Sequence, residues 1–525
     1  MQQGPNRRAF LAGAGAAAAA AMSPGLVPSA RAAPGETAYR TAGELAQALA
    51  DRKVSSRELV DAAIARIEAL DPKINAVVVR DFDRARAAAK AADEALAQGS
   101  STGDKKPLLG LPMTVKEQFR VTGLPTCWGI AKYKDWKPDA DSLVVQRLKA
   151  AGAVILGKTN VPLDLADWQS YNDVYGTTNN PWDFGRTPGG SSGGSAAALA
   201  AGFVPLELGS DIGGSLRAPA HFCGIYAHKT SLEIVPQRGI GYPETPAGPV
   251  RGDMAVIGPM ARSAVDLALE LDVIAGPDEQ WEGVGYKLAL PPPRHDKLAD
   301  YRVLVIDKNP LVPTAESVRA ALGALADRLA KTGCKVMREN PKLPDLARTI
   351  RNYGELLAAF FSRDLPTDAR VRVEVDARNL SPEDQSFTAY RIRGITSTHP
   401  EWLRASGVRN VLRARWQELF GGEVDVVLCP CMPTMAFPHD HSTPKHQRQV
   451  DIDGKKVAYD DQLVWASIAT LTGLPATAAP IGKSDSGLPI GVQIIGGFHE
   501  DRTTIKFAEL IEREFGGFTP PPNFT

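Results

Sequence analysis

The chain has few cysteines and no excess of charge of either sign. Lysine plus arginine and aspartate plus glutamate balance at 60 each over 525 residues. Without a surplus of positive charge, a nucleic-acid partner is not favoured. An odd, unevenly spaced set of cysteines does not form a disulfide framework, so we expect most of them to be buried free thiols. The set is Cys127, Cys223, Cys334, Cys429 and Cys431.

The chain also lacks a long apolar run. Its one candidate follows Arg7-Arg8 near the N-terminus, is rich in alanine and glycine, and ends at about Met22. This run is too short and too weakly apolar to span a bilayer, which takes about 20 apolar residues. With the small-residue cleavage pattern Ala30-Arg31-Ala32, it resembles a twin-arginine export signal. We therefore predict a signal at residues 1–32, no stable membrane insertion, and a periplasmic or secreted protein.

What is present is a regular alternation of helical and strand-like segments. A capping box at Ser55 and Glu58 opens an amphipathic helix that we expect to end at Asp71-Pro72. Apolar segments and helical periodicities then alternate, which favours an α/β fold with helices over a central sheet. The expected strands are 77–79, 111–115, 153–156 and 204–208, and the expected helices are 82–97 and 143–150.

The second half contains a charged, arginine-rich region from about Pro341 to Leu419 with helical periodicity. We interpret it as a helical cap within a single domain at residues 33–525. Strand character returns at 424–428. No repeat of 20 to 50 residues is visible, which excludes a solenoid or a propeller.

Three short patterns match known sites by letter but not by context. The string 152–159 fits a phosphate-binding loop, yet its middle residues Ala-Val-Ile-Leu indicate a strand. Ser442-x-x-Lys445 fits a penicillin-binding signature, but no Ser-Asp-Asn element accompanies it. His439, His441 and His446 have no cysteine or glutamate partner at metal-binding spacing. We therefore expect no nucleotide, metal or other cofactor.

A stronger signal lies in three glycine- and serine-rich or lysine-bearing segments. They are Thr114-Val-Lys-Glu117, Gly189-Gly-Ser-Ser-Gly-Gly-Ser-Ala-Ala197 and Asp211-Ile-Gly-Gly-Ser-Leu-Arg217. Together they resemble the amidase-signature family, and matching segments extend from about Thr41 to Ile511. The resemblance implies one large mixed central β-sheet covered by helices on both faces.

The resemblance also implies a catalytic triad of Ser215 as nucleophile, Ser191 as proton bridge and Lys116 as base, with a cis peptide bond at Ser191. Independently of the family, a serine hydroxyl attacks well only when a nearby base takes its proton. The only histidines near the glycine loops are His221 and His228. A lysine can replace histidine only if burial lowers its pKa by several units.

The backbone N–H groups of Ile212, Gly213 and Gly214 precede the attacking oxygen of Ser215 and form the predicted oxyanion hole. By resemblance, Ser192, Asp211 and Arg217 hold the two loops in register, although a purely structural role suits Arg217 equally well. His228 departs from the family pattern, in which this segment usually reads Gly-Leu-Lys-Pro-Thr. A packed core histidine is the favoured interpretation.

Several alternatives remain. Gly189-x-Ser191-x-Gly193 also matches a nucleophile elbow, in which Ser191 would attack, and a glycine-rich stretch can be a flexible linker. The first hypothesis is hydrolysis of a small-molecule carboxamide to acid and amine. The others are cleavage of esters or carbamates, a catalytically silent binding protein, and the A-type component of an amidotransferase. The sequence leaves open which amide is cleaved and whether the protein is a homodimer.

Overall fold

The computed structural model describes residues 37–99, 106–246, 248, 252–363 and 365–524. The predicted export signal at 1–32 therefore lies outside the described residues. Within these ranges, the helices are all too short or too polar to cross a membrane.

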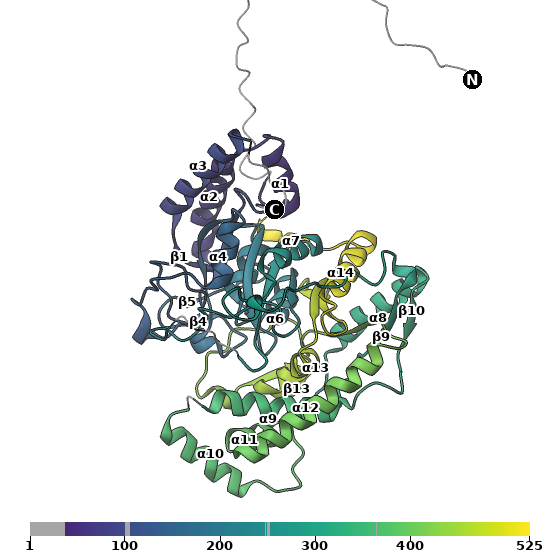
Figure 1. The fold of residues 1–525 in the computed structure, drawn as a ribbon. Helices are drawn as coiled ribbons and strands as arrows, with labels where there is room; N and C mark the ends of the chain where they lie inside the picture. Colours follow the sequence, from purple (N-terminus) through teal and green to yellow (C-terminus); the bar gives the residue numbers. More distant parts are fainter. Residues whose placement is uncertain (1–36, 100–105, 247, 249–251, 364, 525) are drawn as a thin grey trace, which may run out of the picture.

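One mixed sheet of 11 strands organises the molecule, in the order β1-β3-β2-β6-β8-β7-β14-β15-β11-β9-β10 (Figure 1). Strand β2 runs parallel to β3 and β6, and β9 runs parallel to β10 and β11. Its strands are β1 Val77–Arg80, β2 Pro112–Lys116, β3 Val154–Thr159, β6 Leu206–Asp211, β7 Tyr226–Lys229, β8 Val256–Ala261, β9 Arg302–Val305, β10 Lys335–Met337, β11 Val426–Pro430, β14 Ala476–Lys483 and β15 Pro489–Ile495. Two small hairpins pair β4 Tyr171–Asn172 with β5 Gly176–Thr177 and β12 Gln449–Ile452 with β13 Lys455–Ala458.

Helices cover both faces of this sheet, and alternate residues of each strand enter two separate cores. On β3, Val154 and Leu156 belong to one core, whereas Ile155 belongs to the other. This confirms the expected α/β architecture. The helices are α1 Ala42–Ala50, α2 Ser56–Ile74, α3 Phe82–Ala97, α4 Leu143–Ala150, α5 Gly193–Ala200, α6 Arg217–Cys223, α7 Ala264–Ile274, α8 Glu316–Lys331, α9 Leu346–Ser362, α10 Thr367–Asn379, α11 Phe387–Ile395, α12 His399–Phe420, α13 Ser467–Thr472 and α14 Asp501–Phe515.

Helix α2 shows where local signals were sufficient and where they were not. The capping box of Ser55 and Glu58 is formed as predicted. The expected end at Asp71-Pro72 is wrong, because the helix continues to Ile74 and ends at Asn75 in the left-handed conformation. Pro72 lies in the last turn, where its missing N–H costs a single hydrogen bond. The carboxylate of Asp71 then accepts the N–H of Ala76 at 2.7 Å and secures the turn.

Other expectations are confirmed. The phosphate-loop look-alike at 152–159 includes all of β3, and all five cysteines are buried and free. The region after Pro341 is helical, from α9 to α12, and gathers at one end of the molecule beside α13 (Figure 1). Because α9 packs against both α11 and α13, this region is attached directly to the segment that leads into the central strand β14. The helical cap is therefore anchored to the sheet rather than separate from it.

Candidate active site

Lys116 is the last residue of β2, in the middle of a parallel group of three strands. Neighbouring β3 and β6 are buried along nearly their whole length, as β2 is. A side chain at this strand end enters the interior where parallel strands finish together, which is the usual location of ligand sites in such sheets. The Lys116 side chain is fully buried.

The lysine amine contacts hydroxyl groups. Its Nζ lies 2.6 Å from Oγ of Ser191 and 2.9 Å from Oγ of Ser210. Ser210 in turn donates its hydroxyl proton to Oε1 of Gln118 at 2.6 Å. Since that proton is committed, Ser210 accepts from the lysine N–H, and the lone pair of a neutral amine is left to face Ser191.

Burial lowers the pKa of Lys116 to about 7, against the opposing effect of the negative charge on Asp211. An ammonium group in this position loses its hydration and gains only hydroxyl partners. About half of the molecules therefore carry a neutral lysine near pH 7. The requirement stated from the sequence, a lysine able to act as a base, is met by desolvation alone.

The loop before α5 holds Ser191 by close backbone contact. Gly190 has no space for a side chain, because an added Cβ would lie 2.3 Å from the carbonyl oxygen of Asp167. The peptide bond between Gly190 and Ser191 is cis, as the family resemblance implied. The next residue, Ser192, donates its N–H to the carbonyl of Ser215 at 3.2 Å and joins the two loops.

The loop that carries Ser215 is organised by Asp211. Its carboxylate accepts the N–H of Gly214 at 2.9 Å and that of Leu216 at 3.1 Å. Arg217 forms two bonds to the same carboxylate, at 3.0 and 2.8 Å. Burial raises the pKa of Asp211, but the Arg217 charge and these hydrogen bonds outweigh it and lower the pKa to about 2.

Arg217 also reaches beyond its own loop, although its side chain is only 1% exposed. It donates to Oγ1 of Thr470 at 2.8 Å and to the carbonyl of Ala466 at 3.1 Å, and it contacts the side-chain oxygen of Gln493. The predicted supporting role of Asp211 and Arg217 is thus realised as one buried network. Ser192 makes only a long contact, 3.4 Å from its Oγ to the carbonyl of Ser210.

Two side chains fix the peptide planes of the predicted oxyanion hole. Tyr353 donates its hydroxyl to the carbonyl of Ile212 at 2.8 Å, and Trp168 donates its indole N–H to the carbonyl of Gly213 at 3.1 Å. In a trans peptide the N–H points away from the carbonyl. Tyr353 thereby directs the N–H of Gly213, and Trp168 directs the N–H of Gly214.

The structure changes one detail of the predicted hole. The N–H of Gly214 already donates to Asp211, because Asp211 lies on the side to which that peptide plane is turned. Within the described ranges, the N–H groups of Ile212, Gly213 and Ser215 have no protein acceptor. These three groups, rather than Gly214, are available to an incoming carbonyl oxygen.

Ser191 and Ser215 face the same space, a cavity of about 140 Å³ that Ser210 and Gln118 also line. Ser215 lines a second cavity as well, of about 410 Å³, together with Gly213. Ser191 and Ser215 are nearly buried, at 2% and 7% exposure. The residues predicted as a triad are thus gathered at one location from three separate segments of the chain.

A nucleophilic serine, a second serine and a desolvated lysine, with free N–H groups beside them, are joined by a family match. The family description Amidase matches residues 58–505. The chain belongs to this amidase family. Its members are hydrolases of carbon–nitrogen bonds other than peptide bonds, and they act on amides.

Similar proteins cover nearly the whole of this amidase. The chain is 35% identical over 489 residues to "Putative amidase AmiB2" of Mycobacterium tuberculosis (strain ATCC 25618 / H37Rv), covering 91% of this chain and 97% of that protein. It is 33% identical over 510 residues to "Fatty-acid amide hydrolase 2-A" of Danio rerio, covering 92% and 90%.

Two further likenesses extend this range. A glutamyl-tRNA(Gln) amidotransferase component, the A-type one, of Anaeromyxobacter sp. (strain K) is 33% identical over 506 residues, covering 91% of this chain and 97% of that protein. The solved structure of a 6-aminohexanoate cyclic dimer hydrolase with its substrate has 25% identity and a TM-score of 0.73, covering 93% and 100%. The amidase fold and sequence are therefore shared along almost the full length of the chain.

Sequence reasoning did not find four of the residues in this amidase site. Ser210 and Gln118 lie one and two residues from Asp211 and Lys116, at the ends of neighbouring parallel strands, and polar residues at such ends were the available signal. Tyr353 and Trp168 come from distant segments and carry no local pattern.

His228 is a packed core histidine, as expected. It is fully buried, and its ring nitrogens lie 2.9 Å from Oγ1 of Thr477 and 3.0 Å from Oδ1 of Asp501. Both of its nitrogens are thus engaged within the core, and it does not line the cavities at Ser215.

The buried Asp211–Arg217 pair predicts a large loss of stability. Asp211→Asn keeps the shape but leaves Arg217 buried without a counter-charge, which costs about 3–5 kcal/mol of unfolding free energy. Urea denaturation measures this. The control is Asp61→Asn, whose partners Arg57 and Arg86 lie at the surface and which should cost no more than about 1 kcal/mol. Equal losses for the two variants would contradict the role given to Asp211.

Proposed function

We propose that the protein hydrolyses a small-molecule carboxamide to a carboxylic acid and an amine through an acyl-enzyme on Ser215. The observation that carries the proposal is the 2.6 Å contact of Ser191 with the fully buried amine of Lys116. A lysine whose pKa is lowered to about 7 can accept a proton at neutral pH. No metal or organic cofactor enters the proposed reaction.

In the first half-reaction, Oγ of Ser215 bonds to the substrate carbonyl carbon. Its proton passes to Oγ of Ser191 as the proton of Ser191 passes to Nζ of Lys116. The N–H groups of Ile212, Gly213 and Ser215 stabilise the negative carbonyl oxygen of the tetrahedral intermediate. The carbon–nitrogen bond then breaks as the same relay returns a proton to the nitrogen, and the amine leaves.

In the second half-reaction, water attacks the ester carbon of the acyl-enzyme. Lys116 and Ser191 take a proton from that water and return it to Oγ of Ser215. The carbon–oxygen bond to Ser215 breaks, the carboxylic acid leaves, and the free enzyme is restored. Atoms balance as one amide plus one water giving one acid and one amine.

Two further functions keep specific support. The same three residues would form an acyl-enzyme from an ester or carbamate, so kcat/KM for matched amides and esters decides the preference. Relatives named as amidotransferase components favour an A-type role that depends on protein partners. Hydrolysis of added amides by the isolated chain, without any partner, would exclude that dependence.

The nucleophile is tested by substitution and labelling. Ser215→Ala should lower kcat by about four orders of magnitude or more, because the acyl-enzyme can no longer form. A fluorophosphonate should label the native protein once, at Ser215, as located by peptide mass spectrometry. Ser442→Ala, in the rejected penicillin-binding look-alike, is the control and should keep both activity and labelling. Labelling at Ser191 instead would support the nucleophile-elbow alternative.

The pKa of Lys116 predicts the acid limb of the pH profile. The neutral lysine is the active form, so kcat/KM should fall below a midpoint near pH 7, by about tenfold for each pH unit at lower pH. Burial also lowers the pKa of Lys229 to about 7, but its Nζ contacts only the carbonyls of Thr230 and Leu474. Lys229→Met is therefore the control and should keep the midpoint. A flat profile between pH 5 and 7 would exclude Lys116 as the base.

We also propose export of the folded protein through the twin-arginine route, on the strength of Arg7-Arg8 and the cleavage pattern at 30–32. Arg7→Lys with Arg8→Lys should leave the precursor in the cytoplasm of a Gram-negative host. The unchanged protein should be recovered from the periplasm without its first 32 residues. Cell fractionation and N-terminal mass spectrometry measure both outcomes. Periplasmic recovery of the double-lysine variant would contradict this route.

A further inference from the structure

Two cavities meet at Ser215. The smaller, of about 140 Å³, and the larger, of about 410 Å³, have in common six lining residues, which are Asp164, Leu165, Ile212, Ser215, Tyr242 and Phe361. Pockets for whole small-molecule ligands occupy about 300–1,000 Å³. The larger cavity lies in this range and the smaller does not. An amide bound with its carbonyl carbon at Ser215 would therefore place its two halves in spaces of unequal size.

The proton relay distinguishes the two sides. Ser191, Ser210 and Gln118 line only the smaller cavity. In the proposed reaction, the group that relieves Ser215 of its proton must later protonate the leaving nitrogen, and it can do so only from hydrogen-bond distance. The amine half therefore lies on the side of Ser191, in the smaller cavity. The acyl half lies in the larger cavity.

The larger cavity has an apolar inner part and a charged outer part. Trp168, Leu357, Leu365 and Leu463 provide the apolar surface near Ser215, from the cap and from the segment before α13. Arg391 and Lys445 lie at 2.6 and 3.7 Å from the carboxylate of Asp460 and line the same space. A sizeable apolar acyl group can thus bury its chain without leaving a charged side chain unpaired.

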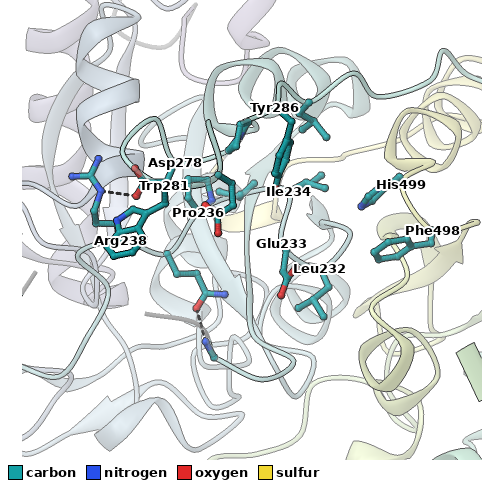
Figure 2. A pocket seen from close by; sticks show the side chains of 16 residues that line it. Leu232, Glu233, Ile234, Pro236, Arg238, Asp278, Trp281, Tyr286, Phe498 and His499 are labelled. Carbon is teal, nitrogen blue, oxygen red and sulfur yellow. Dashed lines mark hydrogen bonds and ion pairs between the residues drawn. The ribbon is translucent and has the colours of Figure 1, made fainter. Parts of the chain in front are cut away.

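A third cavity, of about 570 Å³, begins where the smaller one ends. Figure 2 shows Arg238, Asp278 and Trp281 on one side of it and Phe498 and His499 on the other. Gln237 and Gly252 line both this cavity and the smaller one. Large space is therefore present beyond the amine side, but it is separated from the site.

The side chain of Gln237 forms part of this separation and is held in place. Its Nε2 donates to the carbonyl of Ala255 at 2.7 Å, and its Oε1 accepts the N–H of Gly252 at 3.2 Å. Both ends of the amide group are thus engaged by backbone on the far side of the gap. A side chain fixed at both ends restricts the cavity without depending on the ligand.

We propose that the substrates are carboxamides with a larger apolar acyl group and a compact leaving amine, and that Gln237 sets the upper size of that amine. This inference rests on the proposed function, since the relay identifies the amine side. Ammonia and short alkylamines fit the smaller cavity. Gln237 is a specificity-determining residue that acts by separating this cavity from the third one.

The first experiment compares amines of similar basicity on one acyl group. Hexanamides of methylamine and of naphthylmethylamine are given to the native protein, and kcat/KM is measured for each. The N-methyl amide should be preferred by about tenfold or more, since one or two misfitting carbon groups already cost this much. Equal or reversed preference would overturn the compact amine cavity. Hexanamides should also exceed acetamides, because only the longer acyl group occupies the larger cavity.

The second experiment removes the separation. Gln237→Ala should lower the preference for N-methyl over N-naphthylmethyl hexanamide by about tenfold, since the smaller and third cavities then join. The rate constant of deacylation should respond little, because the amine has left before that step. Leu365→Trp, which narrows only the acyl cavity, is the matched control. It should slow the hydrolysis of both amides together, slow deacylation, and keep their ratio.

An unchanged amine preference in Gln237→Ala would overturn the role of Gln237. If that variant fails to fold, Ile240→Ala enlarges the smaller cavity from within and should shift the ratio in the same direction, and an unchanged ratio there would overturn the proposal equally. Failure of a fluorophosphonate to label Ser215 in the native protein would instead refute the proposed function itself. The two kinds of failure are therefore distinguishable.

Discussion

The site depends on one electrostatic constraint, the burial of the Lys116 amine among neutral partners. Asp211 is the carboxylate whose charge most favours the ammonium form, yet two bonds commit that carboxylate to Arg217. The arginine neutralises the one nearby charge that would otherwise keep the lysine protonated. Desolvation then controls its pKa. Breaking this pair would therefore change both the stability of the fold and the proton affinity of Lys116.

The backbone around Ser215 is arranged on the same principle of committed partners. Tyr353 and Trp168 hold the carbonyls of Ile212 and Gly213, while Asp211 holds the N–H of Gly214. Each of these bonds fixes a peptide plane before any substrate arrives. Fixed dipoles stabilise a developing negative charge without the cost of reorientation. The second half of the chain, which supplies Tyr353, is thus as necessary to the predicted oxyanion hole as the glycine loop.

The sequence was most informative where chemistry and local pattern coincide. Alternating segments predicted the strands that carry Lys116 and Asp211, and the glycine-serine loops identified Ser191 and Ser215 by family resemblance. The partner of Gly214 could not be predicted, because it depends on the direction of a peptide plane held by Trp168 from a distant segment. The helix continued past Pro72 for a similar reason, since the turn after it is secured by contacts outside the helix. Nothing in the sequence around Gln237 distinguishes it from other loop residues.

Amine size and lysine pKa are physically linked in this arrangement. The cavity that receives the leaving amine is the one that Ser191 and Ser210 line, and these serines are the direct contacts of Lys116. A wider cavity would admit more water to the lysine, stabilise its ammonium form and raise its pKa. The relay would then lose part of its base at neutral pH. A compact, dry amine cavity is therefore a condition for a lysine-based relay, and selectivity for small amines follows from how the base is activated.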